Sequence, residues 1–355
     1  MKKILIILDG LADKGSNTSL AKAKTPTLDF LASNGRTGLM YPIKGIAPES
    51  GASQFAILGQ AIKDYPGRGI LEALGINIKI NSKNTYLRCN FAKIKGNKII
   101  HIREKIPSRD LIKKINRIDS SIKIIPALGY RAVMIIKNAS PFISNTHPGY
   151  IRYKTISKAV AGSNLKKKCK PLKNNKLAIQ TAKRINNFIE KLESTLKNKT
   201  LLIRGAGNSL PKIKPLKNWD LIADMPVELG LGRLLKMHIL KKEKNEMQQI
   251  INSKNNIYVQ VKGPDIYGHQ GNLKGKIKAI EKIDRFLKPL TKLKNTLIII
   301  TADHATPCTL KRHSSDPVPL LIYGKTKDKI KKFSEKECKK GSLGIIEGKD
   351  LLSYI

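Results

Sequence analysis

The stretch NTLIIITADHATPC, residues 295–308, joins a short apolar run to an acidic residue and a histidine. Residues 296–301 are rich in isoleucine, a pattern typical of a buried parallel β-strand. Asp303 and His304 follow this run directly, and His313 comes soon after, although the chain has only six histidines. The stretch therefore predicts a strand whose carboxyl end carries reactive or metal-binding side chains.

Four more short runs of isoleucine, leucine and valine predict further buried parallel strands. They are KILIIL at 3–8, TLLIR at 200–204, IYVQVK at 257–262 and VPLLIY at 318–323. Residues 178–196 and 273–288 repeat apolar side chains at helical spacing. This alternation predicts an α/β fold with a doubly wound, mostly parallel sheet, whose ligands bind beyond the carboxyl ends of the strands.

The middle of the chain has a different pattern of polar and apolar residues. From residue 76 to 175 short segments alternate polar and apolar residues, which indicates a smaller mixed domain inserted into the larger one. We therefore expect residues 1–75 and 176–355 to form the large domain, and the lysine-rich tract 162–176 to be a linker. The polar segment 241–256 is expected to be a solvated helix or loop.

The composition is strongly basic, with 68 lysine and arginine residues against 26 acidic ones and a net charge of +42. Such a charge is typical of nucleic-acid-binding proteins. The lysines, however, are spread along the whole chain, and aromatic residues make up only 5% of it. Because no segment interleaves arginine with aromatic side chains as a base-stacking surface does, nucleic-acid binding is disfavoured and a general lysine bias is the better explanation.

Other classes of protein are disfavoured by simple features of the sequence. No apolar run reaches the roughly 18 residues of a membrane span. The start, MKKILIILDG, resembles a signal peptide, but its apolar run is short and ends on Asp9, so we expect a first strand and a cytoplasmic protein. The four cysteines form no CxxC pair, so neither a disulfide framework nor a zinc knuckle is indicated.

Three of the predicted strands end in residues that can bind metals. The set comprises Asp9, Asp265, His269, Asp303, His304 and His313. Each alone could be a turn residue, a helix cap or an ordinary structural histidine. Together, at one edge of a sheet, they indicate two divalent sites with oxygen and nitrogen ligands, which suit zinc or manganese better than magnesium. Phosphoryl transfer is the commonest use of such a pair.

A covalent route also requires a nucleophile. The segment GIAPESGASQFAILG, residues 45–59, offers Ser50 and Ser53 in a turn of small residues before an apolar helical run. A serine at a helix N-terminus lies where backbone N–H groups favour anions, but it could equally be a cap, and the spacing does not decide between these roles. No GxxxxGK[ST] motif occurs, and GAGNSL at 205–210 does not match GxGxxG.

A series of motifs, in order along nearly the whole chain, resembles a known family. They are DG at 9–10, AKTPTLDFLASNG at 23–35, APESGASQFAILG at 47–59, GRGILEALG at 67–75, LRCNFA at 87–92, LLIRGAG at 201–207, KGPDIYGHQGN at 262–272, IEKID at 280–284, TADHATPC at 301–308 and HSSDPVP at 313–319. The chain is similar to the archaeal-type, 2,3-bisphosphoglycerate-independent phosphoglycerate mutases of the alkaline phosphatase superfamily.

The resemblance implies a fold, a metal centre and a reaction. It implies an alkaline-phosphatase-like sheet with an inserted substrate or lid domain, and two divalent ions, expected to be Mn²⁺, with Zn²⁺, Co²⁺ or Mg²⁺ as alternatives. It implies that one ion is held by Asp9, Ser50, Asp303 and His304, and the other by Asp265, His269 and His313. Ser50 would become phosphorylated while 3-phosphoglycerate and 2-phosphoglycerate interconvert in glycolysis and gluconeogenesis.

Anionic substrates of this kind are commonly held by bidentate arginines, and arginine is scarce here beside lysine. Four arginines lie in the matched segments or in the small domain. We expect Arg68, Arg88, Arg103 and Arg204 to bind the substrate, although each could equally be a surface residue.

The sequence departs from the family pattern at several positions. The family usually has an acidic residue directly after the nucleophile and a histidine shortly afterwards, whereas this chain has Gly51 and Gln54, and Leu229 replaces an expected lysine. A phosphohydrolase, or a phosphotransferase of the homoserine-kinase-like kind, is therefore the alternative to the mutase. A non-enzymatic nucleic-acid-binding protein is the third hypothesis.

Overall fold

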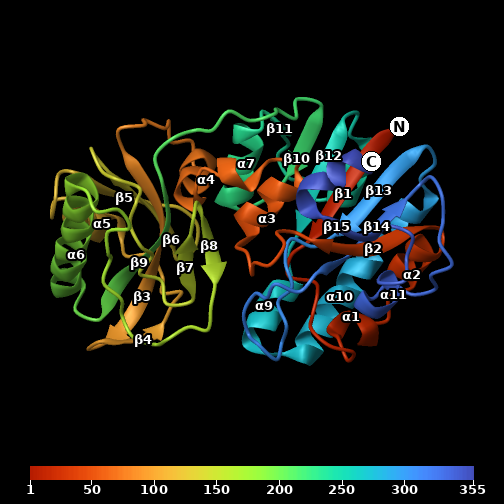
Figure 1. The fold of residues 1–355 in the computed structure, drawn as a ribbon, viewed down its shortest axis with the longest axis horizontal. Coiled ribbons are helices and arrows are strands. Elements are labelled where there is room, and N and C mark those ends of the chain that lie inside the picture. The colour runs from red at the N-terminus through yellow and green to blue at the C-terminus, as the bar shows by residue number, and fades with distance from the viewer. The chain divides into compact units, whose positions relative to one another are not determined.

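The computed structural model describes residues 1–355 and divides into two compact units (Figure 1). Unit 1 comprises Met1–Ala61, Lys214–Asp224 and Leu235–Ile355. Unit 2 comprises Ile62–Ile213 and Met225–Leu234. No helix combines the length and apolar character that a membrane crossing requires.

Unit 1 is built on one eight-stranded sheet, in the order β11-β10-β12-β1-β13-β14-β2-β15. Its strands are β1 (Lys2–Leu8), β2 (Gly35–Tyr41), β10 (Trp219–Ile222), β11 (His238–Ile239), β12 (Asn256–Val261), β13 (Thr296–Thr301), β14 (Val318–Tyr323) and β15 (Gly344–Glu347). The central strand β1 is fully buried from Ile4 to Leu8, which explains why it reads as an unbroken apolar run. All strands are parallel except β14, so the prediction of a mostly parallel α/β sheet is confirmed.

The expected parallel direction of residues 318–323 is wrong. Strand β14 runs antiparallel to both of its neighbours, β13 and β2. Residues 302–317, which join β13 to β14, contain no helix. A parallel return would need a crossover, usually a helix, and this connection provides none, so the chain simply reverses.

The helices of unit 1 are α1 (Ser19–Lys22), α2 (Pro26–Ser33), α3 (Ser50–Ile57), α8 (Glu246–Asn252), α9 (Pro264–Gln270), α10 (Leu273–Leu287) and α11 (Glu335–Cys338), with short 3₁₀ turns at Lys288–Lys292 and Gly348–Ser353. In Figure 1, α1, α9, α10 and α11 lie together below the strands. The predicted amphipathic helix at 273–288 is confirmed as α10, whose buried stripe includes Ile280, Ile283 and Leu287. The segment 241–256 contains α8, capped by the side chain of Asn245.

Unit 2 contains an antiparallel sheet covered by a long helix. Strands β4, β3, β6 and β5 follow one another, and β9 also pairs with β3. The elements are η1 (Ile62–Asp64), α4 (Arg68–Gly75), β3 (Thr85–Lys95), β4 (Lys98–His101), α5 (Arg109–Ile115), β5 (Ile122–Pro126), β6 (Arg131–Ile136), α6 (Lys176–Leu196), β9 (Lys199–Gly207) and α7 (Pro226–Leu234), with a hairpin of β7 (Tyr150–Tyr153) and β8 (Ile156–Ala159).

The structure divides the chain at other places than the expected boundaries, 1–75 with 176–355 and 76–175. Strand β9, expected in the parallel sheet as residues 200–204, pairs antiparallel with β3 in unit 2. Helix α6 packs its Ile185, Phe188 and Leu192 into the same core as Phe91 of β3. An apolar run in the sequence indicates that a strand exists but not which sheet the strand joins. The prediction therefore placed β9 in the wrong sheet.

Two details of unit 2 differ from the expected organisation, one at its limits and one in the expected linker. Helices α4 and α7 cross in close contact, because a Cβ at Gly75 would lie 1.7 Å from the carbonyl of Pro226 and a Cβ at Gly230 would lie 1.8 Å from that of Leu71. The tract 162–176 is not a free linker, since its Cys169 is buried and its backbone N–H donates to Oδ1 of Asn186 on α6.

Candidate active site

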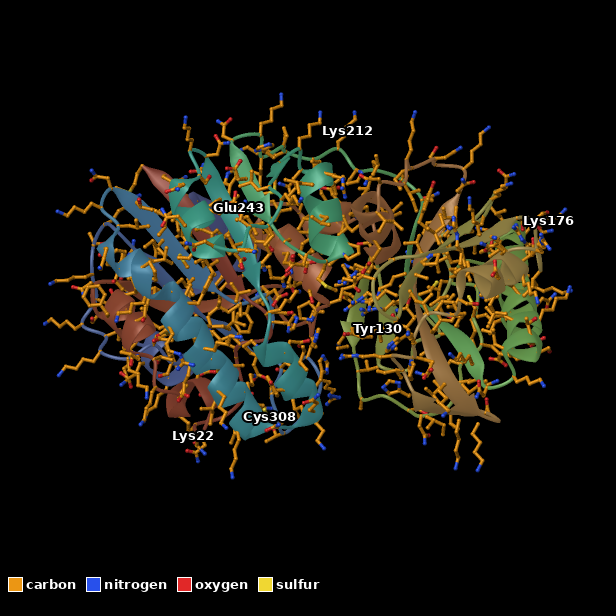
Figure 2. The ribbon with its side chains drawn as sticks, turned by 180° about the vertical axis from the view of Figure 1, so that it is seen from behind. Lys22, Tyr130, Lys176, Lys212, Glu243 and Cys308 are labelled. Atoms are coloured by element: carbon orange, nitrogen blue, oxygen red, sulfur yellow. The ribbon has the colours of Figure 1, made fainter.

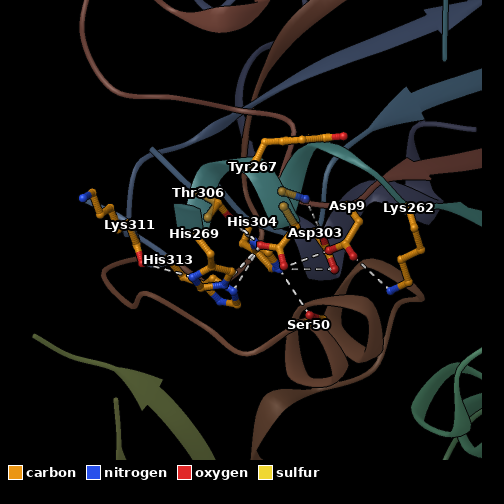
Figure 3. Close-up of polar contacts among 12 residues, drawn as sticks. Asp9, Ser50, Lys262, Tyr267, His269, Asp303, His304, Thr306, Lys311 and His313 are labelled. Carbon is orange, nitrogen blue, oxygen red and sulfur yellow. Dashed lines mark hydrogen bonds and ion pairs between the residues drawn. The ribbon is translucent and has the colours of Figure 1, made fainter. Parts of the chain in front are cut away.

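The carboxyl ends of three neighbouring strands bring the predicted ligands together (Figure 3). Strands β12, β1 and β13 are adjacent and parallel. Asp9 follows β1, Asp265 lies in the first turn of α9 after β12, and the pair Asp303 and His304 follows β13. Two groups of potential metal ligands result: Asp9, Asp303 and His304 form one group, and Asp265, His269 and His313 form the other.

The first group surrounds the Nε2 atom of His304. This atom lies 3.5 Å from Oδ1 of Asp9, 3.6 Å from Oδ2 of Asp303 and 3.2 Å from Oγ of Ser50. His304 is almost fully buried, and burial lowers its pKa even though Asp265 and Asp9 oppose the shift. The imidazole is therefore neutral at pH 7, the form that binds metals.

The second group surrounds one oxygen of Asp265. Its Oδ1 lies 3.4 Å from Nε2 of His269, one helical turn away on α9, and 3.6 Å from Nε2 of His313. Burial opposes ionisation of Asp265, but its hydrogen bond with His313 and the charge of His269 hold its pKa well below the usual range. The rings of His304 and His313 stack at 3.6 Å, so the two groups are in contact.

Backbone carbonyls fix the orientation of two of these histidines. Nδ1 of His269 lies 3.1 Å from the carbonyl oxygen of Lys311, and Nδ1 of His313 lies 2.6 Å from that of Pro48. A carbonyl can only accept, so each Nδ1 carries a proton and donates it to the backbone, and this leaves each Nε2 facing Asp265. This arrangement of a ligand nitrogen and a hydrogen-bonded second nitrogen is typical of metal-binding histidines.

Asp303 is held by two buried amides. Nε2 of Gln54 and Nε2 of Gln260 donate to its Oδ2 at 3.1 and 3.2 Å, and the backbone N–H of Gly10 donates to Oδ1 at 3.3 Å. Burial and the neighbouring carboxylate of Asp9 raise the pKa of Asp303 to about 8. Ionised carboxylates packed this closely require a compensating cation.

The donor set fits a divalent cation. Oδ2 of Asp9 pairs with Nζ of Lys262 at 3.0 Å, but its Oδ1, which faces His304, is buried and has no hydrogen-bond partner. A buried carboxylate oxygen left in this way is costly unless a cation binds it. Mixed carboxylate and imidazole ligands suit transition metals such as manganese and zinc.

The structure distinguishes the two candidate serines. Ser50 is the first residue of α3, and its hydroxyl contacts His304 rather than capping the helix, whose N-cap residue is Glu49. Ser53 is fully buried within the helix, and its hydroxyl bonds to the carbonyl of Glu49. Of the two serines, only Ser50 therefore presents its hydroxyl to the candidate metal ligands, at a helix end that favours an incoming anion.

Three of the four predicted arginines gather in unit 2, two of them beside the carboxylate of Glu72. Nε of Arg68 lies 2.8 Å from Oε1 of Glu72, and Nε of Arg88 lies 3.8 Å from the same oxygen. Arg88 on β3 and Arg204 on β9 are direct partners in the antiparallel register. Arg103, by contrast, is exposed, with its guanidinium carbon 5.7 Å from the centre of the Tyr130 ring.

The arginine cluster has an excess of positive charge. Burial, with Arg204 and Arg68 nearby, lowers the pKa of Arg88 to about 9, so its guanidinium stays charged at neutral pH. Burial also lowers the pKa of His147, and Arg204 and Arg88 lower it further, so His147 is neutral. Buried cations that repel one another in this way favour an anionic ligand between them.

Sequence reasoning missed several residues of both clusters. Figure 2 shows Tyr130 beside a group of nitrogen atoms, and Arg131 lies 4.5 Å from the centre of its ring. Burial opposes ionisation of Tyr130, but Arg88 and Arg131 lower its pKa. Beside the candidate metal ligands, Gln260 and Thr306 were also missed, and only Gln260 carried a signal, as a polar residue inside an apolar strand.

Comparison with known proteins gives a consistent result. A family model described as the Metalloenzyme superfamily matches residues 1–354. The chain is 34% identical to a probable 2,3-bisphosphoglycerate-independent phosphoglycerate mutase of Thermosipho melanesiensis, over 99% of this chain and 92% of that protein. It is 32% identical to 2,3-bisphosphoglycerate-independent phosphoglycerate mutase 1 of Archaeoglobus fulgidus, over 99% and 97% of the two chains.

Two solved structures resemble the whole fold. A protein from Pyrococcus horikoshii superimposes with a TM-score of 0.76 at 25% identity, over 99% of this chain and 96% of that one. A cofactor-independent phosphoglycerate mutase from Thermoplasma acidophilum gives a TM-score of 0.59 at 25% identity, over 100% and 99% of the two chains. The full-length matches agree with the cluster of acids and histidines at the strand ends, and the chain belongs to the 2,3-bisphosphoglycerate-independent phosphoglycerate mutases of the metalloenzyme superfamily.

Proposed function

We propose that this protein is a metal-dependent mutase that interconverts 3-phosphoglycerate and 2-phosphoglycerate through a phosphoserine at Ser50. The reaction belongs to glycolysis and gluconeogenesis, and we assign it to the cytoplasm. The observation that carries the proposal is the contact of 3.2 Å between the Ser50 hydroxyl and Nε2 of His304, inside a group of potential metal ligands. A nucleophile placed beside metal ligands is the arrangement that phosphoryl transfer requires.

The ligand sets accommodate two divalent ions. Asp9, Asp303 and His304, with Ser50, would hold one, and Asp265, His269 and His313 would hold the other. We propose Mn²⁺ for both, because the donors combine carboxylate oxygen with imidazole nitrogen. Bound ions would offset the charge of the phosphoryl group and favour the ionised form of the serine hydroxyl.

The side chains of this protein then carry out the transfer. The Ser50 oxygen attacks phosphorus, a bond from Oγ to phosphorus forms, and the bond from phosphorus to the glycerate oxygen breaks. The serine proton is balanced by the proton that the departing glycerate hydroxyl gains. In the return step the other glycerate hydroxyl attacks phosphorus, the bond to Oγ breaks, and Ser50 regains its proton.

We assign anion binding to the arginine cluster. At neutral pH phosphoglycerate carries a phosphate and a carboxylate, and Arg68, Arg88 and Arg204 are buried guanidinium groups held by Glu72 and by the strand register. Buried guanidinium groups bind such anions with paired, charge-assisted hydrogen bonds. Arg103 is exposed, and we assign it a peripheral contact beside Tyr130.

Phosphorus NMR tests the proposal directly. Metal-stripped protein is incubated with 3-phosphoglycerate before and after addition of Mn²⁺. A 2-phosphoglycerate signal that grows only with metal, with little free phosphate, is the expected result. Free phosphate as the main product would replace the mutase by a phosphohydrolase. Transfer to an added acceptor would replace it by a phosphotransferase. If no reaction occurred with any metal, the mutase and both alternative activities toward this substrate would be excluded.

A further inference from the structure

Thr306 joins the two groups of metal ligands. It is fully buried, and its hydroxyl donates a hydrogen bond to Oδ1 of Asp265 at 2.8 Å. The same oxygen lies 3.0 Å from Nδ1 of His304. Asp265 belongs to one ligand group and His304 to the other, so a single hydroxyl contacts a member of each.

The positions of the protons follow from the chemistry of these three groups. An ionised carboxylate can only accept, so the single proton of the Thr306 hydroxyl points to Asp265. The hydroxyl oxygen must then accept from His304, and Nδ1 of His304 carries the proton. Its Nε2 is therefore left with an electron pair, directed toward Ser50 and Asp9.

The surrounding backbone holds the hydroxyl in place. The N–H of Thr306 donates to the carbonyl of Ala12 at 3.0 Å, and the ammonium of the buried Lys276 donates to the carbonyl of Thr306 at the same distance. Two glycines make room for it: a Cβ at Gly10 would lie 2.8 Å from the Thr306 hydroxyl, and one at Gly268 would lie 2.4 Å from the Thr306 carbonyl. The threonine has little freedom to move away from its two partners.

We propose that Thr306 is a positioning residue that couples the two metal sites. It fixes the tautomer of His304 in one site and the direction of the Asp265 carboxylate in the other. The inference rests on the proposed metal-dependent function. Because one hydroxyl serves both ligands, its loss weakens both sites together. A residue that supported only one ligand would weaken one site and leave the other unchanged.

The test is a set of three variants, each measured as metal-free protein titrated with Mn²⁺ by calorimetry. Thr306→Val keeps the shape and removes the hydroxyl, and we expect both affinities to fall by about tenfold or more, as for other partners of metal ligands. Thr306→Ser keeps the hydroxyl and should stay within about threefold of the parent protein. Thr301→Val is the matched control, because the Thr301 hydroxyl is also fully buried but bonds only to the carbonyl of Pro319.

A second measurement reads the tautomer of His304 itself. In ¹⁵N-histidine-labelled, metal-free protein, the nitrogen shifts of His304 should report the Nδ1–H form, and Thr306→Val should change them while Thr301→Val should not. If Thr306→Val does not fold, Thr306→Ala is measured instead. The proposal is overturned if the hydroxyl-free variant binds both ions as tightly as the parent, or loses affinity at one site only. If the parent protein bound no metal, the proposed metal-dependent function itself would be contradicted.

Discussion

The acidic cluster of unit 1 and the basic cluster of unit 2 are built in different ways. In unit 1, carboxylates and imidazoles lie just beyond the ends of three parallel strands. In unit 2, Arg88 and Arg204 lie opposite each other within an antiparallel sheet. We propose that cations complete one cluster and anions the other, because like charges gathered in a buried place are costly alone. The difference teaches that strand geometry can gather like charges in two ways, beyond the ends of parallel strands or across an antiparallel pair.

The largest effect is expected in the acidic cluster, from Ser50→Ala. Loss of the nucleophile should reduce mutase turnover by roughly 10³-fold or more, since the phosphoserine can no longer form. Asp9, Asp303 and His304 remain, so the variant should still bind metal. Turnover is followed by phosphorus NMR and metal content by elemental analysis. Ser53→Ala is the control, and substantial activity in Ser50→Ala would contradict the covalent route.

The matching test of the basic cluster is Arg204→Lys. It keeps the charge but loses the paired donors, and the substrate KM should rise by about 10- to 100-fold while Mn²⁺ affinity stays unchanged. Steady-state kinetics and calorimetry measure the two quantities. The control is Arg184→Lys, because Arg184 lies in the same unit but bonds only to Ser121 and the carbonyl of Lys137. Equal effects of the two substitutions would argue against an anion site.

The pH dependence of the free energy of unfolding should report on the acidic cluster, through Asp303. Because the pKa of Asp303 is raised to about 8, the folded metal-free protein keeps a proton that the unfolded chain releases near pH 4. The stability from this group is therefore present at low pH and is lost as pH rises through about 8. Buried histidines act in the opposite direction, but only up to about pH 6.5, where the unfolded imidazoles lose their protons.

The effect of Asp303 on stability can therefore be measured without the histidines between about pH 6.5 and 8. In it the free energy of unfolding of the metal-free protein should fall by at most about 2 kcal/mol, the limit set by one proton. Asp303→Asn should remove this slope, and Mn²⁺ should reverse it in the parent protein by favouring the ionised carboxylate. Urea unfolding at several pH values measures the effect. If the free energy of unfolding of Asp303→Asn still fell with pH in this range, another group would be responsible for the slope.

The comparison also explains what the sequence could predict. Strand ends are visible in a sequence, because a short apolar run stops at a polar residue, and so Asp9, Asp265 and Asp303 could be placed at one edge of a sheet. The runs at 200–204 and 318–323 look the same, yet one lies in the other sheet and one is reversed, because periodicity carries no information about strand partners. Thr306 could not be found, because its role depends on contacts with residues distant in the chain.

The smallest effect is expected at Gln54, where the chain departs from the family pattern. Its amide is one of two that donate to Oδ2 of Asp303, so Gln54→Leu leaves the bond from Gln260 in place. Loss of one ordinary hydrogen bond should weaken Mn²⁺ binding by about three- to tenfold. Gln54→His, which restores the residue type usual in the family, should bind close to the parent if its ring also donates to Asp303.

The control for this last prediction is Gln60→Leu. Gln60 is equally buried and donates to the carbonyls of Leu58 and Lys214, so its loss costs a similar amount of stability without reaching the metal ligands. Calorimetric titration with Mn²⁺ compares the three variants. If Gln54→Leu bound Mn²⁺ as tightly as the parent protein, Gln260 alone would suffice to hold Asp303, and the departure at residue 54 would be neutral for the metal. A weaker site would show that the amide at residue 54 contributes to metal binding by holding this carboxylate.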